Sequence, residues 1–339
     1  MLSYYRYFQR VNISSDNMTF RTELHIKPWS EPLDYSSRIV TLGSCFAHNI
    51  AHRLAQSKFR VVDSPTGILF NPASIAHSME LMVGGFTIDP QSLIRLGGRV
   101  LSYDFHSSVS GQSVESATAT MNEALRTGGE AIKHSDIIIV TLGTAWVYRL
   151  RSTGDVVANC HKQPASNFSR ELLSVEECVE CLERIMALAP RRVLFTLSPV
   201  RHIGDGLEDN SLSKATLRVA IHRICEAYTE RASYFPAYEI MLDDLRDYRF
   251  YSSDMLHPSD TAISYIAEKF FDAALSSEAK ALRMKINKLI QAYEHRPFDP
   301  HSEEYKHFCR QQLKAIEGIE GVDLSAEKAY FESALQINL

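Results

Sequence analysis

Short apolar runs alternate with amphipathic segments along residues 38–271. The strongest run, residues 136–142, is a continuous β-branched stretch typical of a strand that is buried on both faces. Shorter runs predict further strands at 38–42, 59–63, 192–197 and 234–240. Helical spacing of apolar residues predicts helices at 47–56, 71–82, 120–133, 174–188, 213–231 and 259–270. Strands that alternate with helices indicate a parallel sheet covered by helices on both faces.

Three segments depart from this alternation. Residues 84–119 are rich in Gly, Ser and Gln, which predicts an insertion or an irregular loop. Residues 146–150 and 155–159 flank a Ser-Thr-Gly turn, which predicts a hairpin. Beyond residue 276 only helical periodicity remains. We therefore expect an α/β domain over 1–275, with an insertion at about 84–119, and a helical C-terminal extension over 276–339.

Composition and charge exclude several classes of partner. The 339 residues are 45% hydrophobic and 23% charged with a net charge of -5, as in an ordinary globular protein. No Lys/Arg run resembles a nucleic-acid or lipid footprint, and no stretch approaches ~20 apolar residues. Residues 1–8 are aromatic, but too polar and too short for a secretion signal. The six sparse cysteines are typical of reduced thiols. We expect a cytoplasmic protein without a nucleic-acid or membrane partner.

Two clusters could suggest a metal site. Cys178 and Cys181 have metal-like spacing, but they lie in a predicted amphipathic helix and no further ligands follow at motif spacing. We interpret them as two half-buried helix cysteines. The acidic run at 243–247 is better explained as a solvated or salt-bridged turn. The sequence therefore predicts neither a metal nor another cofactor.

Polar residues follow the predicted strands. In an open α/β sheet, ligands bind beyond the carboxyl ends of the strands. The segments found there begin at Gly43-Ser44, at Gly67 with Asn71 beyond it, at Gly143-Thr144, and at Ser198 with Arg201 and His202 beyond it. A further polar segment, Asp254 with His257 beyond it, comes late in the chain, just before a predicted capped helix. We expect these groups to collect at one edge of the sheet.

Ser44, His257 and Asp254 have the chemistry of a nucleophile with its base and orienting acid. A serine hydroxyl needs a base to take its proton, and histidine can be that base near neutral pH. A carboxylate on the other ring nitrogen fixes the tautomer and stabilises the imidazolium. Ser44 at a helix entrance also lies beside backbone N–H groups suited to an oxyanion. The pattern alone leaves open that Ser44 is merely a helix N-cap.

Several segments resemble one known family. Gly43-Ser44-Cys45-Phe46-Ala47 is the signature after which the GSCFA family is named. The resemblance covers about residues 20–271 and is specific in the combination and order of its segments. The other segments are Phe70-Asn71-Pro72, Leu142-Gly143-Thr144-Ala145-Trp146, Cys160-His161-Lys162, Ser198-Pro199-Val200-Arg201-His202, Tyr234-Phe235-Pro236-Ala237-Tyr238-Glu239, Asp247-Tyr248-Arg249-Phe250-Tyr251 and Asp254-Met255-Leu256-His257-Pro258.

The GSCFA family is similar to the SGNH, or GDSL-like, hydrolases, and this resemblance implies a fold and site roles. The implied fold is a three-layer α/β/α flavodoxin-like parallel sheet. Carried over by position, Ser44 matches the nucleophile, Asp254 the orienting acid and His257 the base. Gly67 matches the glycine whose N–H joins the oxyanion hole.

One departure concerns the oxyanion hole. SGNH enzymes usually have Gly-x-Asn-Asp after the third strand, whereas Ala145 stands in the place of that Asn here. Losing an oxyanion donor typically costs about 10²–10³ in rate. Asn71 or Thr144, which follows Gly143, could supply a donor instead.

Further residues have both a functional and a structural interpretation. Cys45 could replace Ser44 as nucleophile, or pack inward under the helix. Arg201 could clamp a carboxylate or phosphate beside His202, or both could be structural loop residues. His161, near the hairpin end, could close over Ser44. His106 is a weaker site candidate, and Trp146 lines a pocket or anchors the hairpin.

The predicted function is a serine-dependent ester hydrolase, such as a deacylase or acetylesterase, acting through an acyl-Ser44 intermediate on a small-molecule or glycan ester. Two alternatives stay open at this point. One is acyl transfer to a sugar or other alcohol with the same triad. The other is a catalytically weak binding protein on the same fold, suggested by Ala145. A homo-oligomer formed through the C-terminal helices is compatible with each of them.

Overall fold

The computed structural model describes residues 21–336, so the prediction about a secretion signal at residues 1–8 lies outside the described part. A central sheet of five parallel strands confirms the predicted α/β class. Its spatial order is β10 (Ala232–Phe235), β9 (Arg192–Leu197), β5 (Ile137–Leu142), β1 (Arg38–Gly43) and β2 (Arg60–Asp63). Counted along the chain, this is the doubly wound order 2-1-3-4-5, which reverses between β1 and β5.

The register of the strands sets where their carboxyl ends lie. Gly43 pairs with Thr141, Thr141 with Thr196, and Thr196 with Phe235. Four strands therefore end nearly level. The residues that follow them share one edge, as the sequence predicts.

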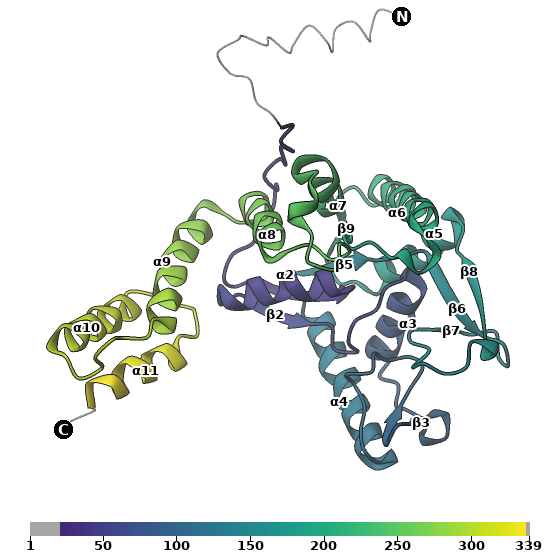
Figure 1. The fold of residues 1–339 in the computed structure, drawn as a ribbon, viewed down its shortest axis with the longest axis horizontal. Coiled ribbons are helices and arrows are strands. Elements are labelled where there is room, and N and C mark those ends of the chain that lie inside the picture. The colour runs from purple at the N-terminus through teal and green to yellow at the C-terminus, as the bar shows by residue number, and fades with distance from the viewer. Residues whose placement is uncertain (1–20, 337–339) are drawn as a thin grey trace, which may run out of the picture.

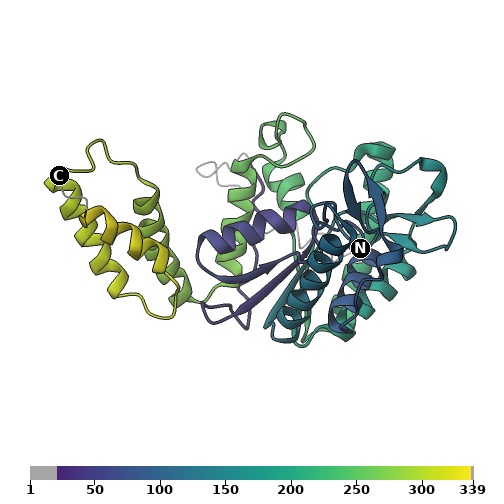
Figure 2. The same ribbon diagram turned by 90° about the horizontal axis from the view of Figure 1, so that it is seen from below.

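Helices cover both faces of the sheet (Figures 1 and 2). One face packs against α3 (Pro72–Val83), α4 (Val114–Lys133), α5 (Val175–Leu188) and α6 (Leu207–Ala227). The other packs against α2 (Cys45–Gln56) and α8 (Asp260–Ala274). Alternation along β1 explains the two layers, because Val40 and Leu42 enter the first core while Ile39 enters the second. Burying each such side chain contributes roughly 1.5–3 kcal/mol.

The predicted insertion contains a short hairpin, β3 (Ile94–Leu96) with β4 (Arg99–Leu101). Residues 114–119, predicted to belong to it, are helical instead. The reason is a capping box at Ser113, whose side chain accepts the N–H of Ser116 while the Ser116 hydroxyl accepts the N–H of Ser113, so that α4 begins at Val114.

The predicted hairpin after β5 forms from β6 (Trp146–Leu150) and β7 (Val156–Val157). A third antiparallel strand, β8 (Phe168–Leu172), was not predicted. Its Phe-Ser-Arg-Glu-Leu sequence is polar in the middle because that part of the strand faces solvent.

The strand predicted at 234–240 ends earlier, at Phe235. Pro236 has no N–H for a strand partner, so the chain turns there. The helical turn α7 (Ala237–Glu239) and a π-helical segment, η4 (Ile240–Leu245), follow. Single 3-10 turns lie at Pro90–Ser92, Ala165–Asn167, Ile203–Asp205 and Tyr248–Phe250.

The C-terminal residues form the predicted helical extension, a lobe of α9 (Ser277–Glu294), α10 (Glu303–Glu317) and α11 (Ser325–Gln336) beside the sheet domain (Figures 1 and 2). Its own core includes Leu289, Cys309 and Phe331. Helix α9 joins the lobe to the domain, because Ile286 belongs to the α2/α8 core. None of the described helices combines the length and apolarity needed to cross a bilayer.

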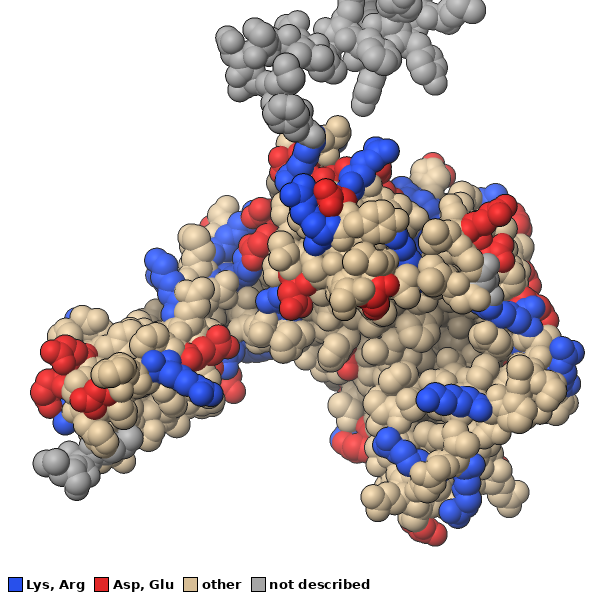
Figure 3. All heavy atoms as spheres, viewed as in Figure 1, with Lys and Arg blue, Asp and Glu red and all other residues tan. Residues whose placement is uncertain are grey.

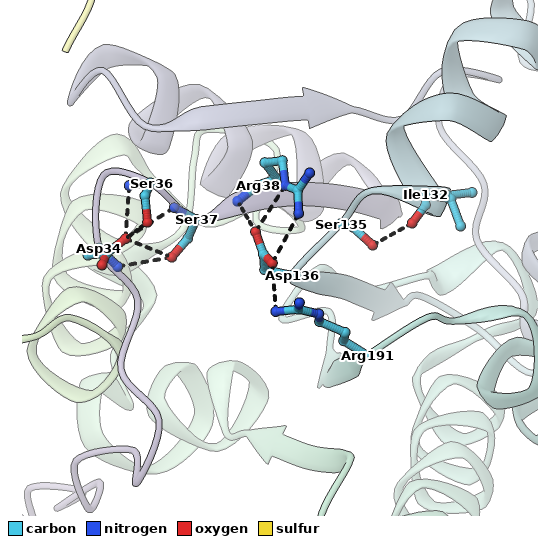
Figure 4. A network of polar contacts seen from close by, with 8 residues as sticks. All are labelled: Asp34, Ser36, Ser37, Arg38, Ile132, Ser135, Asp136 and Arg191. Atoms are coloured by element: carbon cyan, nitrogen blue, oxygen red, sulfur yellow. Dashed lines mark hydrogen bonds and ion pairs between the residues drawn. The ribbon is translucent and has the colours of Figure 1, made fainter. Parts of the chain in front are cut away.

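The amino ends of the strands are held by ion pairs (Figure 4). Asp136 accepts hydrogen bonds from the backbone and side chain of Arg38 and from Arg191, whose guanidinium is 3.0 Å away. This network ties β1, β5 and β9 together at the edge opposite the candidate site. On the face seen in Figure 3, basic and acidic side chains are interspersed.

Candidate active site

Ser44 lies in a tight turn between β1 and α2. Gly43 has φ +125°, and a Cβ at this position would lie 2.1 Å from the carbonyl oxygen of Thr141, so only glycine fits. The Ser44 N–H donates to that carbonyl over 3.0 Å. The Ser44 Oγ caps α2 by accepting the N–H of Phe46 at 3.3 Å, and the residue is fully buried. The predicted N-cap role is therefore present.

Asp254 and His257 form a hydrogen-bonded pair in a compact loop. The Asp254 Oδ2 lies 2.7 Å from the His257 Nδ1, while its Oδ1 accepts the N–H groups of Leu256 and His257 at 2.9 and 3.0 Å. Met255, at φ +60°, makes the tight turn possible. These backbone donors, followed by the His257 ring, lower the Asp254 pKa to about 2. The carboxylate is thus ionised and the ring orientation fixed.

The loop that carries this pair lies against the end of β9. The Arg201 N–H donates to the Leu256 carbonyl at 3.1 Å. Burial first, then the charges of Lys214 and His257, lower the pKa of His202 to about 3. The Asp254–His257 pair, called the dyad from here on, is therefore at the same sheet edge as Ser44. Within residues 21–336, no hydrogen bond joins Ser44 Oγ to His257, and the His257 Nε2 has no partner.

Most predicted oxyanion donors are already engaged. The Gly67 N–H, at φ +81°, donates to the Ser64 carbonyl over 2.7 Å. The N–H groups of Gly143 and Thr144 both donate to the Phe70 carbonyl, at 2.7 and 3.0 Å. These three backbone groups therefore stabilise the loops rather than point to a ligand.

Asn71 presents its amide differently. It caps α3, and its Oδ1 accepts the Ser74 N–H at 2.8 Å. That bond fixes the amide orientation, so the NH₂ group is turned away from the helix. No hydrogen bond of the described residues uses this NH₂. Asn71 is the predicted donor that remains available at this edge.

Ala145 could not easily be replaced by the usual asparagine. It is fully buried in the core that α3, α4, α5 and α6 cover, and its N–H donates to the Oγ of Ser213 on α6 at 2.7 Å. The same hydroxyl lies 3.0 Å from the Thr144 Oγ1. An amide side chain here would enter apolar surroundings instead of the site.

Lys214 was not predicted and is the most unusual group at this edge. Its Nζ donates to the carbonyls of Gly143 and Ser198, each at 2.7 Å, and the residue is 1% exposed. Burial lowers its pKa to about 7. One lysine thus fastens the ends of β5 and β9. A signal was present in the sequence: Lys214 stands three residues before Leu217, on the apolar face of α6.

A second histidine–aspartate contact was also missed. His48, one turn into α2 from Ser44, has its Nδ1 2.5 Å from the Asp63 Oδ2. Asp63 ends β2 and also accepts the Thr41 hydroxyl at 2.8 Å. The His48 side chain is 59% exposed. Ser44 therefore has two histidine–carboxylate pairs in its surroundings, and an experiment must distinguish them.

His106 lies against Gly67 and His161 against Ser102, and no hydrogen bond of the described residues joins either histidine to Ser44. His161 is buried with φ +48°, its Nε2 is 2.7 Å from the Ser102 carbonyl, and its Nδ1 has no partner among the described residues. Burial lowers its pKa. A Cβ on Gly67 would lie 2.4 Å from the His106 Cβ. His106 thus packs the insertion against the loop after β2, and His161 binds the insertion at Ser102.

The remaining candidates have structural surroundings. Burial raises the pKa of Cys45, which disfavours its thiolate. Cys178 and Cys181 are buried on α5, deeper than the half-buried positions predicted. Within the described residues, no group of three or more metal-ligating side chains is present.

The acidic run at 243–247 is salt-bridged, as predicted, but one member is not solvated. Asp244 is 3% exposed and pairs with Arg21 at 2.8 Å. Asp247 pairs with Arg249 at 3.3 Å.

Trp146, on β6, stacks under Arg170 at 5.0 Å, which supports its role as a hairpin anchor.

Arg201 and His202 follow β9 at this edge. The guanidinium of Arg201 lies 4.0 Å from the Tyr251 ring centroid. His202 packs edge-on against Phe70, and its buried Nε2 has no partner in the described chain. His202 therefore packs beside Gly143 at the end of β5, whereas the Arg201 side chain lies against Tyr248, Tyr251 and Met255.

Comparison with known proteins identifies the family of this chain. The profile of the GSCFA family matches residues 38–270, the whole sheet domain. The chain belongs to the GSCFA family. A second profile, "GSCFA domain protein, C-terminal domain", matches residues 286–337, which contain α10 and α11. The family signature is thus the buried turn that carries Ser44.

Solved structures of more distant proteins also match the chain. The chain is similar to "The structure of a putative platelet activating factor from Streptococcus pneumonia", with 12% identity and a TM-score of 0.35, over 80% of this chain and 89% of that one. No curated protein matches the chain.

Proposed function

We propose that this GSCFA protein is a serine-dependent ester hydrolase of SGNH type. The observation that carries the proposal is the Asp254–His257 pair, at 2.7 Å, with its second carboxylate oxygen held by two backbone N–H groups. This arrangement leaves the Nε2 of His257 as the open ring nitrogen. The strand order 2-1-3-4-5, with Ser44 after the first strand, supports the SGNH-like assignment.

In the proposed reaction, the Ser44 Oγ attacks the acyl carbonyl carbon and the His257 Nε2 takes the hydroxyl proton. Asp254 stabilises the imidazolium that forms. The leaving alcohol departs with that proton, and water then attacks the acyl-serine, again with His257 as base. The NH₂ of Asn71 donates to the oxyanion in place of the usual asparagine. Ser44 and His257 come within hydrogen-bond reach when substrate binds, since such contacts are commonly long without ligand.

A non-catalytic binding function on the same fold is the second candidate. Ser44 is fully buried, and the N–H groups of Ser44, Gly67 and Gly143 already have backbone partners. A ligand would then bind over the exposed dyad without attack by serine. The cytoplasmic location stays a prediction from the cysteine pattern.

Turnover of a short-chain aryl acetate separates these functions. We expect release of the aryl alcohol by the wild type and none by Ser44→Ala. Added alcohol acceptors distinguish hydrolysis from transfer, because a transferase forms the new ester and a hydrolase releases free acid. A wild type that binds the ester without turning it over would favour the binding function.

A further inference from the structure

Arg201 carries a charge that no carboxylate of residues 21–336 neutralises. Its guanidinium lies over the rings of Tyr251 and Tyr248, at 4.0 and 5.1 Å, and its hydrogen-bond partner is the Met255 carbonyl at 3.5 Å. Five other arginines of the described residues also stack on aromatic rings, among them Arg170. The other four each pair with an acidic side chain as well: Arg21, Arg218, Arg249 and Arg283.

A cavity of about 190 Å³ opens beside this guanidinium; its other lining residues are Met241, Leu242, Arg246, Asp247, Tyr248 and Tyr251. Its one carboxylate is already paired, since Asp247 lies 3.3 Å from Arg249. Tyr251 is 7% exposed; its hydroxyl is buried beside the Arg201 guanidinium, and no carbonyl or carboxylate of the described chain accepts its proton. The cavity therefore has a surplus of donors and too few acceptors. An anion would satisfy both the guanidinium and the tyrosine hydroxyl.

The cavity borders the dyad loop. The Arg201 backbone is bonded to Leu256, the residue directly before His257, and its side chain reaches the Met255 carbonyl. A group held by Arg201 would thus lie beside the loop that carries His257. The volume is below the ~300–1,000 Å³ of sites for drug-sized ligands, so it suits one headgroup.

We propose that Arg201, with Tyr248 and Tyr251, binds a carboxylate or phosphate group of the substrate next to the Asp254–His257 loop. The orientation of the substrate rests on the proposed function, in which the bound anion would direct the ester of the same substrate toward His257. The substrate class is accordingly an acyl ester that carries an anionic group. Binding of the anion itself requires neither Ser44 nor turnover.

The test is calorimetric titration of the wild type with benzoate, phenyl phosphate and benzyl alcohol. We expect one or both anions to bind and the neutral alcohol not to bind. Arg201→Gln should weaken anion binding roughly 10- to 100-fold, the range for a lost charged hydrogen bond. Arg201→Lys keeps the charge but lacks the planar guanidinium, so its anion affinity should lie between those of the wild type and Arg201→Gln. The preferred anion identifies the headgroup.

Arg218→Gln is the matched control, because Arg218 also stacks on a tyrosine, at 4.2 Å, but has Glu239 as partner. It should bind anions as the wild type does. No anion binding by the wild type, or equal binding by Arg201→Gln, would overturn the subsite. Anion binding without ester turnover would refute the proposed hydrolase and leave the subsite standing.

Discussion

Replacing Lys214 by methionine tests the most unusual interaction in the site. The ammonium is buried and bonded to two carbonyls, and its pKa falls from an ordinary 10.5 to about 7. Between these two pH values Lys214 is protonated in the unfolded chain but has lost its proton in the folded protein. Stability must therefore rise with pH across this window, by up to ~1.4 kcal/mol per unit and about 5 kcal/mol in all. Lys214→Met removes this dependence.

The substitution has two opposite effects on stability near neutral pH. It removes two charged hydrogen bonds, which costs about 1.5–3 kcal/mol each, and it removes the cost of burying a charge. The two effects roughly cancel there. We therefore expect similar stability of the two proteins at about pH 7, and a wild type favoured by about 4 kcal/mol more at about pH 10. Denaturant unfolding followed by tryptophan fluorescence measures this, since both tryptophans, Trp29 and Trp146, lie in the sheet domain.

Lys280→Met is the matched control. Lys280 also donates to a carbonyl, that of Asp272 at 2.6 Å, but at the surface. Its replacement should leave the pH dependence unchanged. Parallel stability curves for the wild type and Lys214→Met would refute the account of a buried lysine that loses its proton near neutral pH.

Three further outcomes follow from the site. Asn71→Asp keeps an oxygen to cap α3 but removes the NH₂, so aryl acetate turnover should fall by about 10²–10³ with little loss of stability; equal turnover would remove Asn71 from the oxyanion hole. Gly43→Ala should destabilise the fold by more than ~1–3 kcal/mol in thermal unfolding, because of its φ and the contact with Thr141; a wild-type melting temperature would contradict this. The low pKa of Asp254 contributes stability that is complete above its ordinary pKa and is lost as pH falls through about 2. Asp254→Asn should therefore flatten the acid limb of an unfolding titration, and an unchanged limb would count against the lowered pKa of Asp254.

The sheet was predictable because its signal is local. The apolar run at 136–142 and the shorter runs around it require burial on two faces, and a parallel sheet supplies that. Errors arose where a cap or a proline set the boundary, as at Ser113 and Pro236. The strand β8 was missed because its exposed face leaves little apolar pattern.

The site was predictable only in part. Ser44 could be chosen from its position after the first strand, and Asp254 and His257 from their spacing just before a capped helix. The structure places all three at one edge. Which donors are free could not be predicted, because the engagement of Gly67 and Gly143 depends on distant loops. Lys214 required the packing of α6 against the strand ends, which periodicity alone does not supply.

Labelling with a fluorophosphonate probe near neutral pH tests the central claim most directly. We expect mass spectrometry to find the probe on Ser44 in the wild type, with strong loss of labelling in His257→Ala. His48→Ala, which breaks the other histidine–aspartate contact, should still be labelled. Ser174→Ala, which loses the N-cap of α5 and so matches the capping loss in Ser44→Ala, should be labelled like the wild type. An unlabelled Ser44 in the wild type, or labelling that depends on His48 and not on His257, would contradict the account.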